Sequence, residues 1–253
     1  MIDSHAHLTD KRVLPDLDAV VQRAKQAGMT HIINICTDLD SLKKGLALSR
    51  SSPWIRTAAA TTPHDAHQEN PDFRLALKTA AEEETLVAIG ETGLDYHYYP
   101  ETSKIQRKLL EWHIDLAFER NLPLIIHCRE AFKDLFDVLK HCSIPTLLHC
   151  FTGTLDEAEK ALDRGWSLSF SGIITFKNSR SLLEIATKVP LDRLLIETDT
   201  PYLAPVPFRG KPCEPSFLIE TAKVLAEGRD LSLEALLKAT SENALSFFRL
   251  NPV

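Results

Sequence analysis

Short apolar runs alternate with longer amphipathic stretches along the whole chain. The runs are residues 1–4, 31–36, 55–60, 86–89, 124–126, 146–148, 167–170 and 193–196. This rhythm predicts eight parallel strands that are joined by right-handed crossover connections containing helices.

Some of the intervening stretches carry a clear helical period. In residues 14–27 the apolar positions recur at spacings of three and four, and Gly28 follows as a predicted C-cap. Similar patterns predict helices at residues 105–120 and 156–164. A last helix at residues 232–248 is expected to pack on the outside of the fold.

Length and composition favour one α/β barrel. The chain has 253 residues, and barrels of this kind need about 200–250. Its 44% hydrophobic and 25% charged residues are ordinary for a soluble globular protein. No linker rich in proline or serine divides the chain. We therefore expect a (β/α)8 TIM-type barrel as a single domain over residues 1–253, with a doubly wound open sheet as the alternative.

Cysteine usage and charge restrict the compartment and the partners. The five cysteines are widely spaced without a C-x-x-C motif, which favours a reducing compartment. No apolar run approaches the roughly 20 residues of a membrane span, and no signal peptide is visible. We expect a cytoplasmic protein that contacts no membrane and acts as a monomer. Its net charge of −6 argues against a broad duplex-binding surface, although a local basic site remains possible.

Polar residues with metal-binding chemistry follow several of the predicted strands. His5 and His7 are two residues apart, so on a strand their side chains point to the same side. Neutral imidazole is a common ligand for zinc and similar ions. Further candidates at strand ends are Glu91, His127, His149 and Asp199.

In a barrel the carboxyl ends of all strands share one face, which holds the active site. These six side chains should therefore converge on one or two divalent metal ions. Imidazole favours Zn, whereas carboxylate also suits Mg and Mn. A bridging Glu91 could hold two metals about 3.5–4 Å apart, as in two-metal hydrolytic sites.

Six segments resemble the TatD-related DNase family, a branch of the metal-dependent amidohydrolase superfamily. The segments are IDSHAH at 2–7, AIGETGLDY at 88–96, IHCR at 126–129, HCFTG at 149–153, SGIITFKN at 171–178 and ETDTPYLAPVPFRGKPCEP at 197–215. The resemblance covers essentially the whole chain. It implies a TIM-type barrel and divalent-metal-dependent hydrolysis of phosphodiester bonds in DNA, with a role in DNA repair or degradation.

The resemblance also implies roles for individual residues. One metal would be held by His5, His7, Glu91 and Asp199. The second would be held by Glu91, His127 and His149. As catalytic residues the resemblance implies Glu91 together with Asp199, which would act as the general base or orient the attacking water.

Two positions depart from the family pattern. Where members commonly have His-Pro-His, this chain has Thr62-Pro63-His64, so that only the second histidine is matched. Cys213 stands where asparagine is usual, and a thiol is a poorer hydrogen-bonding group than an amide. The first departure puts one substrate contact in doubt, and the second puts the anchoring of its loop in doubt.

Substrate contacts are expected from loops on the same face. Four basic residues could hold flanking phosphates, and His64 is the remaining candidate contact. The basic residues are Arg129, Lys177, Arg209 and Lys211. A ring-rich loop at residues 96–99 is a candidate for stacking on a base.

Three functions remain open at this point. The first is a deoxyribonuclease, expected to be an exonuclease, that uses metal-activated water on single-stranded DNA or strand ends. The second is a metal-dependent hydrolase of another ester or amide, such as an aminoacyl ester on tRNA or a small lactone, since fold alone does not choose the reaction. The third is a non-enzymatic nucleic-acid-binding or scaffold protein, which the complete ligand set and the acidic charge disfavour.

Overall fold

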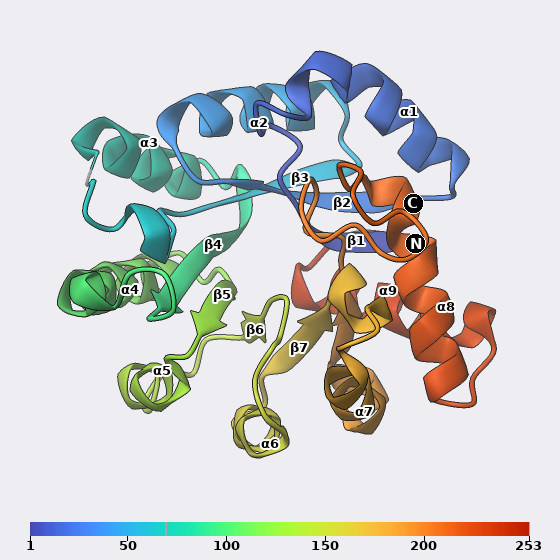
Figure 1. Cartoon of the computed structure of the whole chain (residues 1–253). Coiled ribbons are helices and arrows are strands. Elements are labelled where there is room, and N and C mark those ends of the chain that lie inside the picture. Colours follow the sequence, from blue (N-terminus) through green and yellow to red (C-terminus); the bar gives the residue numbers. More distant parts are fainter. Residues whose placement is uncertain (69, 253) are drawn as a thin grey trace.

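Eight strands surround a common axis in the computed structural model of this protein (Figure 1). The structure describes residues 1–68 and 70–252. All neighbouring strands are parallel, and their order in the sheet is their order in the sequence. The strands are β1 (Ile2–Ala6), β2 (His31–Cys36), β3 (Ile55–Ala59), β4 (Leu86–Asp95), β5 (Leu124–Arg129), β6 (Thr146–Leu148), β7 (Ser167–Phe170) and β8 (Leu194–Ile196).

A helix follows each strand and packs on the outside of the sheet (Figure 1). The helices are α1 (Leu17–Gln26), α2 (Leu39–Ser51), α3 (Pro71–Glu82), α4 (Ser103–Glu119), α5 (Phe132–Val138), α6 (Leu155–Asp163), α7 (Arg180–Lys188), α8 (Leu218–Gly228) and α9 (Leu233–Phe247). This alternation places every parallel crossover on the outer side of the sheet.

The first and last strands meet and nearly close the barrel. Ser4 Oγ in β1 donates a hydrogen bond to the Ile196 carbonyl of β8 at 3.0 Å. Ala6 pairs in parallel with Thr200 just beyond β8. A doubly wound open sheet would leave these two strands apart at opposite edges, so the predicted (β/α)8 barrel is confirmed.

Two apolar clusters lie on the two faces of the sheet. Alternate residues of one strand belong to different clusters: Ile33 and Ile35 to the smaller one, Ile32 and Cys36 to the larger. This is the alternation expected of a strand buried on both sides. The smaller cluster draws on strands all around the barrel and also includes Phe248 at the end of α9. It therefore forms the barrel interior.

Strand positions were predicted well, but two strands extend further than expected. β4 continues beyond residue 89 to Asp95, and β5 continues beyond residue 126 to Arg129. The extension follows a register shift after Ile89, beyond which Gly93 pairs with His127. Glu91 and His127 therefore lie within paired strands and not in loops after them, which gives both side chains rigid backbone support.

Local signals at helix ends also behave as expected. Gly28 adopts a φ of 84° after α1, as its C-cap prediction requires. The predicted helix at residues 14–27 begins as a separate 3-10 turn over Leu14–Asp16.

The five cysteines are free. Among the described residues no helix combines the length and apolar character needed to cross a membrane.

Candidate metal centre

The structure brings the six predicted ligands together at the carboxyl ends of the strands. The His5 side chain is fully buried, and the Asp199 side chain is 14% exposed. The six residues are contributed by β1, β4, β5 and the segments that follow β1, β6 and β8. They are His5, His7, Glu91, His127, His149 and Asp199.

The first group of ligand atoms surrounds one point. Nε2 of His5 and Nε2 of His7 are 3.2 Å apart. Both nitrogens lie 3.5 Å from Oε2 of Glu91. Oδ1 of Asp199 lies 3.9 Å from the His5 nitrogen and 3.6 Å from the His7 nitrogen. Ligands that bind a Zn-sized ion at about 2.0–2.2 Å are separated by roughly 3–3.5 Å, so this spacing fits a shared cation.

The second group uses the other oxygen of the same carboxylate. Oε1 of Glu91 lies 3.0 Å from Nδ1 of His127 and 2.9 Å from Nε2 of His149. These three residues, like His5, His7 and Asp199, have ligand atoms close enough to hold a metal ion. Glu91 thus directs one oxygen toward each group, as a bridging carboxylate would.

Two further carboxylates orient the histidines. Nε2 of His127 donates a hydrogen bond to Oδ2 of Asp95 at 3.0 Å. Nδ1 of His149 donates to Oε1 of Glu197 at 3.2 Å. Because each carboxylate fixes the proton on one ring nitrogen, the nitrogen that faces Glu91 has a free lone pair in the neutral ring. A lone pair directed at a carboxylate oxygen needs a positive charge between them, which is either a metal ion or a proton on the ring.

The electrostatics of the centre favour a cation. Burial opposes ionisation of Glu91, but His149, His127 and His5 outweigh it and lower the pKa of Glu91 well below its usual value. Burial likewise opposes the charged form of His149, but Glu91 and Glu197 raise its pKa well above the ordinary range. Glu91 thus stays ionised and favours positive charge in the centre.

Comparison with known proteins agrees with this geometry. The family described as TatD related DNase matches residues 2–249. The chain belongs to the TatD-related DNase family. It is 37% identical to the uncharacterized metal-dependent hydrolase YabD of Bacillus subtilis, over 99% of this chain and 100% of that protein. It is 34% identical to a Pantoea vagans protein named 3′-5′ ssDNA/RNA exonuclease TatD, over 99% of this chain and 100% of that protein.

A solved structure of a TatD homologue also matches the fold of this chain. The crystal structure of YjjV, a TatD homologue from Escherichia coli K12, aligns with a TM-score of 0.93 at 29% identity. The alignment covers 99% of this chain and 98% of that chain. The protein is therefore a metal-dependent hydrolase of the TatD family, as its sequence motifs indicated.

Sequence reasoning missed Asp95, Glu197 and Asp3, the carboxylates that support the centre of this TatD-family protein. Asp3 accepts hydrogen bonds from the backbone of His5 and Thr198 and from the Thr198 hydroxyl, and thereby ties β1 to the segment after β8. All three carboxylates are fully buried. The available signal was their spacing, because each lies two or four residues from a predicted ligand.

His64 and Arg129, two of the predicted substrate contacts, both lie close to Tyr98, and their contact with substrate stays a prediction. Nε2 of His64 donates a hydrogen bond to Oδ2 of Asp95 at 2.8 Å, so one carboxylate joins His64 to His127. The guanidinium of Arg129 lies 4.8 Å from the centre of the Tyr98 ring. That ring is 57% exposed and also contacts His64 edge-on. Both residues thus stand beside the metal centre, next to an accessible aromatic side chain.

The other three basic residues lie in the loops after β7 and β8. Arg209 is anchored, because it donates to the Ala204 carbonyl and lies 3.7 Å from the centre of the Phe176 ring. Lys177 and Lys211 are exposed. Within the described part of the chain, none of the three hydrogen bonds to the six clustered side chains. Their contact with substrate stays a prediction.

The two departures from the family pattern have clear local partners. The hydroxyl of Thr62 donates to Oδ2 of Asp65 at 3.0 Å and is thus directed into its own turn. Cys213 is buried, and its backbone N–H donates to the Pro201 carbonyl at 3.0 Å. The backbone therefore anchors the loop without the asparagine that other members carry.

Proposed function

We propose that this protein is a divalent-metal-dependent deoxyribonuclease that hydrolyses phosphodiester bonds in DNA, as an exonuclease on single-stranded ends. The observation that carries the proposal is the position of the Glu91 carboxylate, whose two oxygens face two separate groups of ligands. Two-metal sites of this kind favour in-line displacement at phosphorus because they stabilise both the attacking and the leaving oxygen. The name of the Pantoea vagans relative supports a nucleic acid substrate with a free 3′ end.

The first metal would be held by His5, His7, Glu91 and Asp199. The second would be held by Glu91, His127 and His149. When bound, divalent metal ions lower the pKa of water at the site and neutralise charge on the phosphoryl oxygens.

Asp199 would accept a proton from the attacking water. Its carboxylate borders the first group of ligands, and its side chain retains access to solvent. The backbone fixes it, because the Asp199 N–H donates to the His5 carbonyl at 2.9 Å. A base held in this way needs little reorganisation during the reaction.

The opposite side of the centre would bind the substrate backbone. Arg129 offers a guanidinium to a flanking phosphate, and the neighbouring Tyr98 ring offers a face to an unpaired base. His64 would border the same phosphate region. These contacts suit a flexible single strand, whose bases are free to stack.

The deciding experiment uses single-stranded DNA labelled at the 5′ end or at the 3′ end. Purified protein is incubated with EDTA and then with Mg²⁺, Mn²⁺ or Zn²⁺, beside an Asp199→Ala variant. We expect metal-dependent cleavage that the variant loses, with a product ladder that shows the polarity. Substrate binding should weaken as the salt concentration rises.

The proposal fails if folded protein carries metal but cleaves no DNA with any of the three ions. Hydrolysis of an aminoacyl ester or a lactone under the same conditions would then identify the alternative activity. Little effect of salt on substrate affinity would point in the same direction, since a small neutral substrate displaces few counterions.

A further inference from the structure

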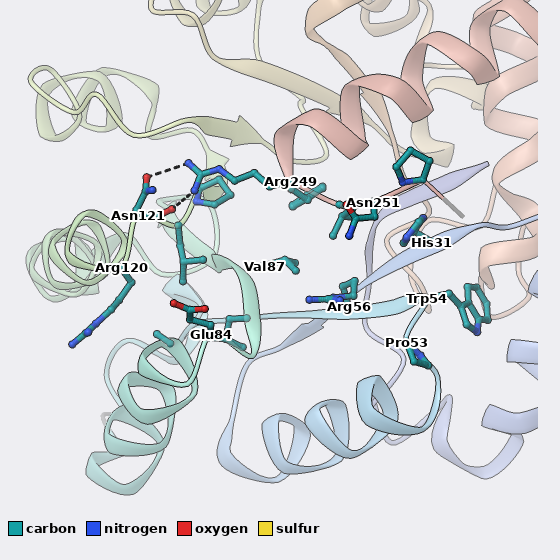
Figure 2. A pocket seen from close by; sticks show the side chains of 17 residues that line it. His31, Pro53, Trp54, Arg56, Glu84, Val87, Arg120, Asn121, Arg249 and Asn251 are labelled. Carbon is teal, nitrogen blue, oxygen red and sulfur yellow. Dashed lines mark hydrogen bonds between the residues drawn. The ribbon is translucent and has the colours of Figure 1, made fainter.

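A second recess lies at the opposite end of the barrel from the metal centre. It is bordered by the residues at which β2, β3 and β4 begin and by the chain that follows α9. Its volume is about 670 Å³, within the range of roughly 300–1,000 Å³ that is usual for small-molecule sites. Figure 2 shows the recess with Arg56 and Arg249 on two of its walls.

Positive charge without a carboxylate partner gathers at this recess. Among the described residues the side chain of Arg56 makes no hydrogen bond or ion pair, and the guanidinium of Arg249 donates only to the carbonyl and side-chain oxygens of Asn121. The ammonium nitrogen of Lys25 lies 5.3 Å from the centre of the Trp54 ring. Burial, together with Arg56 and the amino terminus, lowers the pKa of His31. Among the described residues of the lining, Glu84 carries the one acidic side chain.

Buried polar atoms without a partner gather at the same place. Five such side-chain atoms occur within the described ranges, and three belong to residues of this lining: His31 Nδ1, Trp54 Nε1 and Arg120 Nε. Arg120 points away from the recess in Figure 2 and pairs with Glu82. The two unpaired atoms that remain are His31 Nδ1 and Trp54 Nε1. Buried donors and acceptors are normally paired, so two unpaired atoms on residues of one lining are unusual.

We infer that this recess is a second ligand site that binds a nucleoside monophosphate. Arg56 and Arg249 would hold the phosphate, because two guanidinium charges match a dianion and each guanidinium can bind phosphate through two parallel hydrogen bonds. The base would lie near Trp54, which lines the same recess. An exonuclease releases products of this class, although that link alone rests on the proposed function.

The test is a calorimetric titration of the metal-loaded protein with dAMP, carried out without DNA. Arg56→Gln is the main variant, because among the described residues the Arg56 side chain makes no hydrogen bond or ion pair that the substitution would remove. Arg180→Gln is the matched control, since Arg180 is an exposed arginine that contacts only Glu184. Asp199→Asn separates this site from the metal centre, where a nucleotide could also bind. Inorganic phosphate and deoxyadenosine probe the two halves of the ligand.

We expect saturable binding of dAMP that weakens about tenfold in Arg56→Gln, as for loss of a charged hydrogen bond. Binding should be unchanged in Arg180→Gln and in Asp199→Asn, and weaker for each half of the ligand alone. Absence of saturable binding would overturn the inference. So would binding that Asp199→Asn abolishes and Arg56→Gln retains. Because no turnover is measured, either result is independent of DNA hydrolysis.

Discussion

The imidazole of His127 is held by the carboxylate of Asp95, with Nε2 and Oδ2 3.0 Å apart. Burial opposes ionisation of Asp95, but hydrogen bonds from His127 and His64 lower its pKa well below the usual value. The carboxylate therefore stays charged and fixes the ring orientation, with Nδ1 directed at Glu91. Asp95 thus supports the second group of ligands without belonging to it.

Replacement of Asp95 by asparagine should weaken the affinity for the second metal by about 10–100-fold, as is usual when the partner of a ligating histidine is removed. Calorimetric titration of metal into the apo protein measures this affinity. Asp134→Asn is the control, because Asp134 accepts a hydrogen bond from the nearby Tyr96 hydroxyl but contacts no proposed ligand. Unchanged affinity in Asp95→Asn would contradict the orienting role.

Glu91→Gln should lower the metal content at both sites, because each of its oxygens faces one group of ligands. An amide offers a single weak oxygen ligand and places N–H donors against the histidines. Elemental analysis of the purified protein gives metal ions per chain. Glu111→Gln changes an exposed glutamate of α4 and should leave the content as it was. Loss of one ion alone would argue against bridging.

Gly93→Ala should destabilise the protein by about 3 kcal/mol or more, the range of backbone strain combined with steric overlap. Gly93 has a φ of 145°, and an added Cβ would lie 1.9 Å from the His127 carbonyl oxygen. Urea denaturation measures the free energy of unfolding. Gly28→Ala is the matched control, since Gly28 also has a positive φ but has open space around it. It should cost only about 1–2 kcal/mol.

His113 should make the protein less stable in acid. This histidine of α4 is buried, its Nε2 accepts from the Thr61 N–H, and its Nδ1–H donates to the Thr92 hydroxyl. Burial lowers its pKa to about 3. Between pH 6.5 and about pH 3 the unfolded chain therefore binds a proton that the folded chain excludes. Stability rises with pH across this window, at up to about 1.4 kcal/mol per pH unit from this group.

The measurement compares the free energy of unfolding near pH 5 and near pH 7. His113→Gln keeps one donor and one acceptor but does not titrate. We expect the variant to lose about 1–2 kcal/mol less than the wild type on acidification. Equal losses in the two proteins would show that His113 does not contribute to the acid sensitivity.

The strand order and most of the proposed ligands could be predicted because both depend on local patterns. Apolar runs mark strands, and polar residues directly after them mark one end of a barrel. His5 and His7 share a side because a strand repeats every two residues. These relations involve neighbours in the chain, so one sequence was enough to predict them.

The structure beyond the predicted strand ends could not be predicted, because it depends on tertiary contacts. The continuation of β4 to Asp95 follows from a register shift against β5, which no periodicity announces. The pairing of Glu197 with His149 joins residues 48 positions apart.

The sequence by itself therefore determined the barrel and the chemistry at its carboxyl end. Only the tertiary structure decided which carboxylates orient the histidines, and that Arg56 and Arg249 line one recess at the other end. Such contacts depend on how the sheet closes, and closure is a property of all eight strands together.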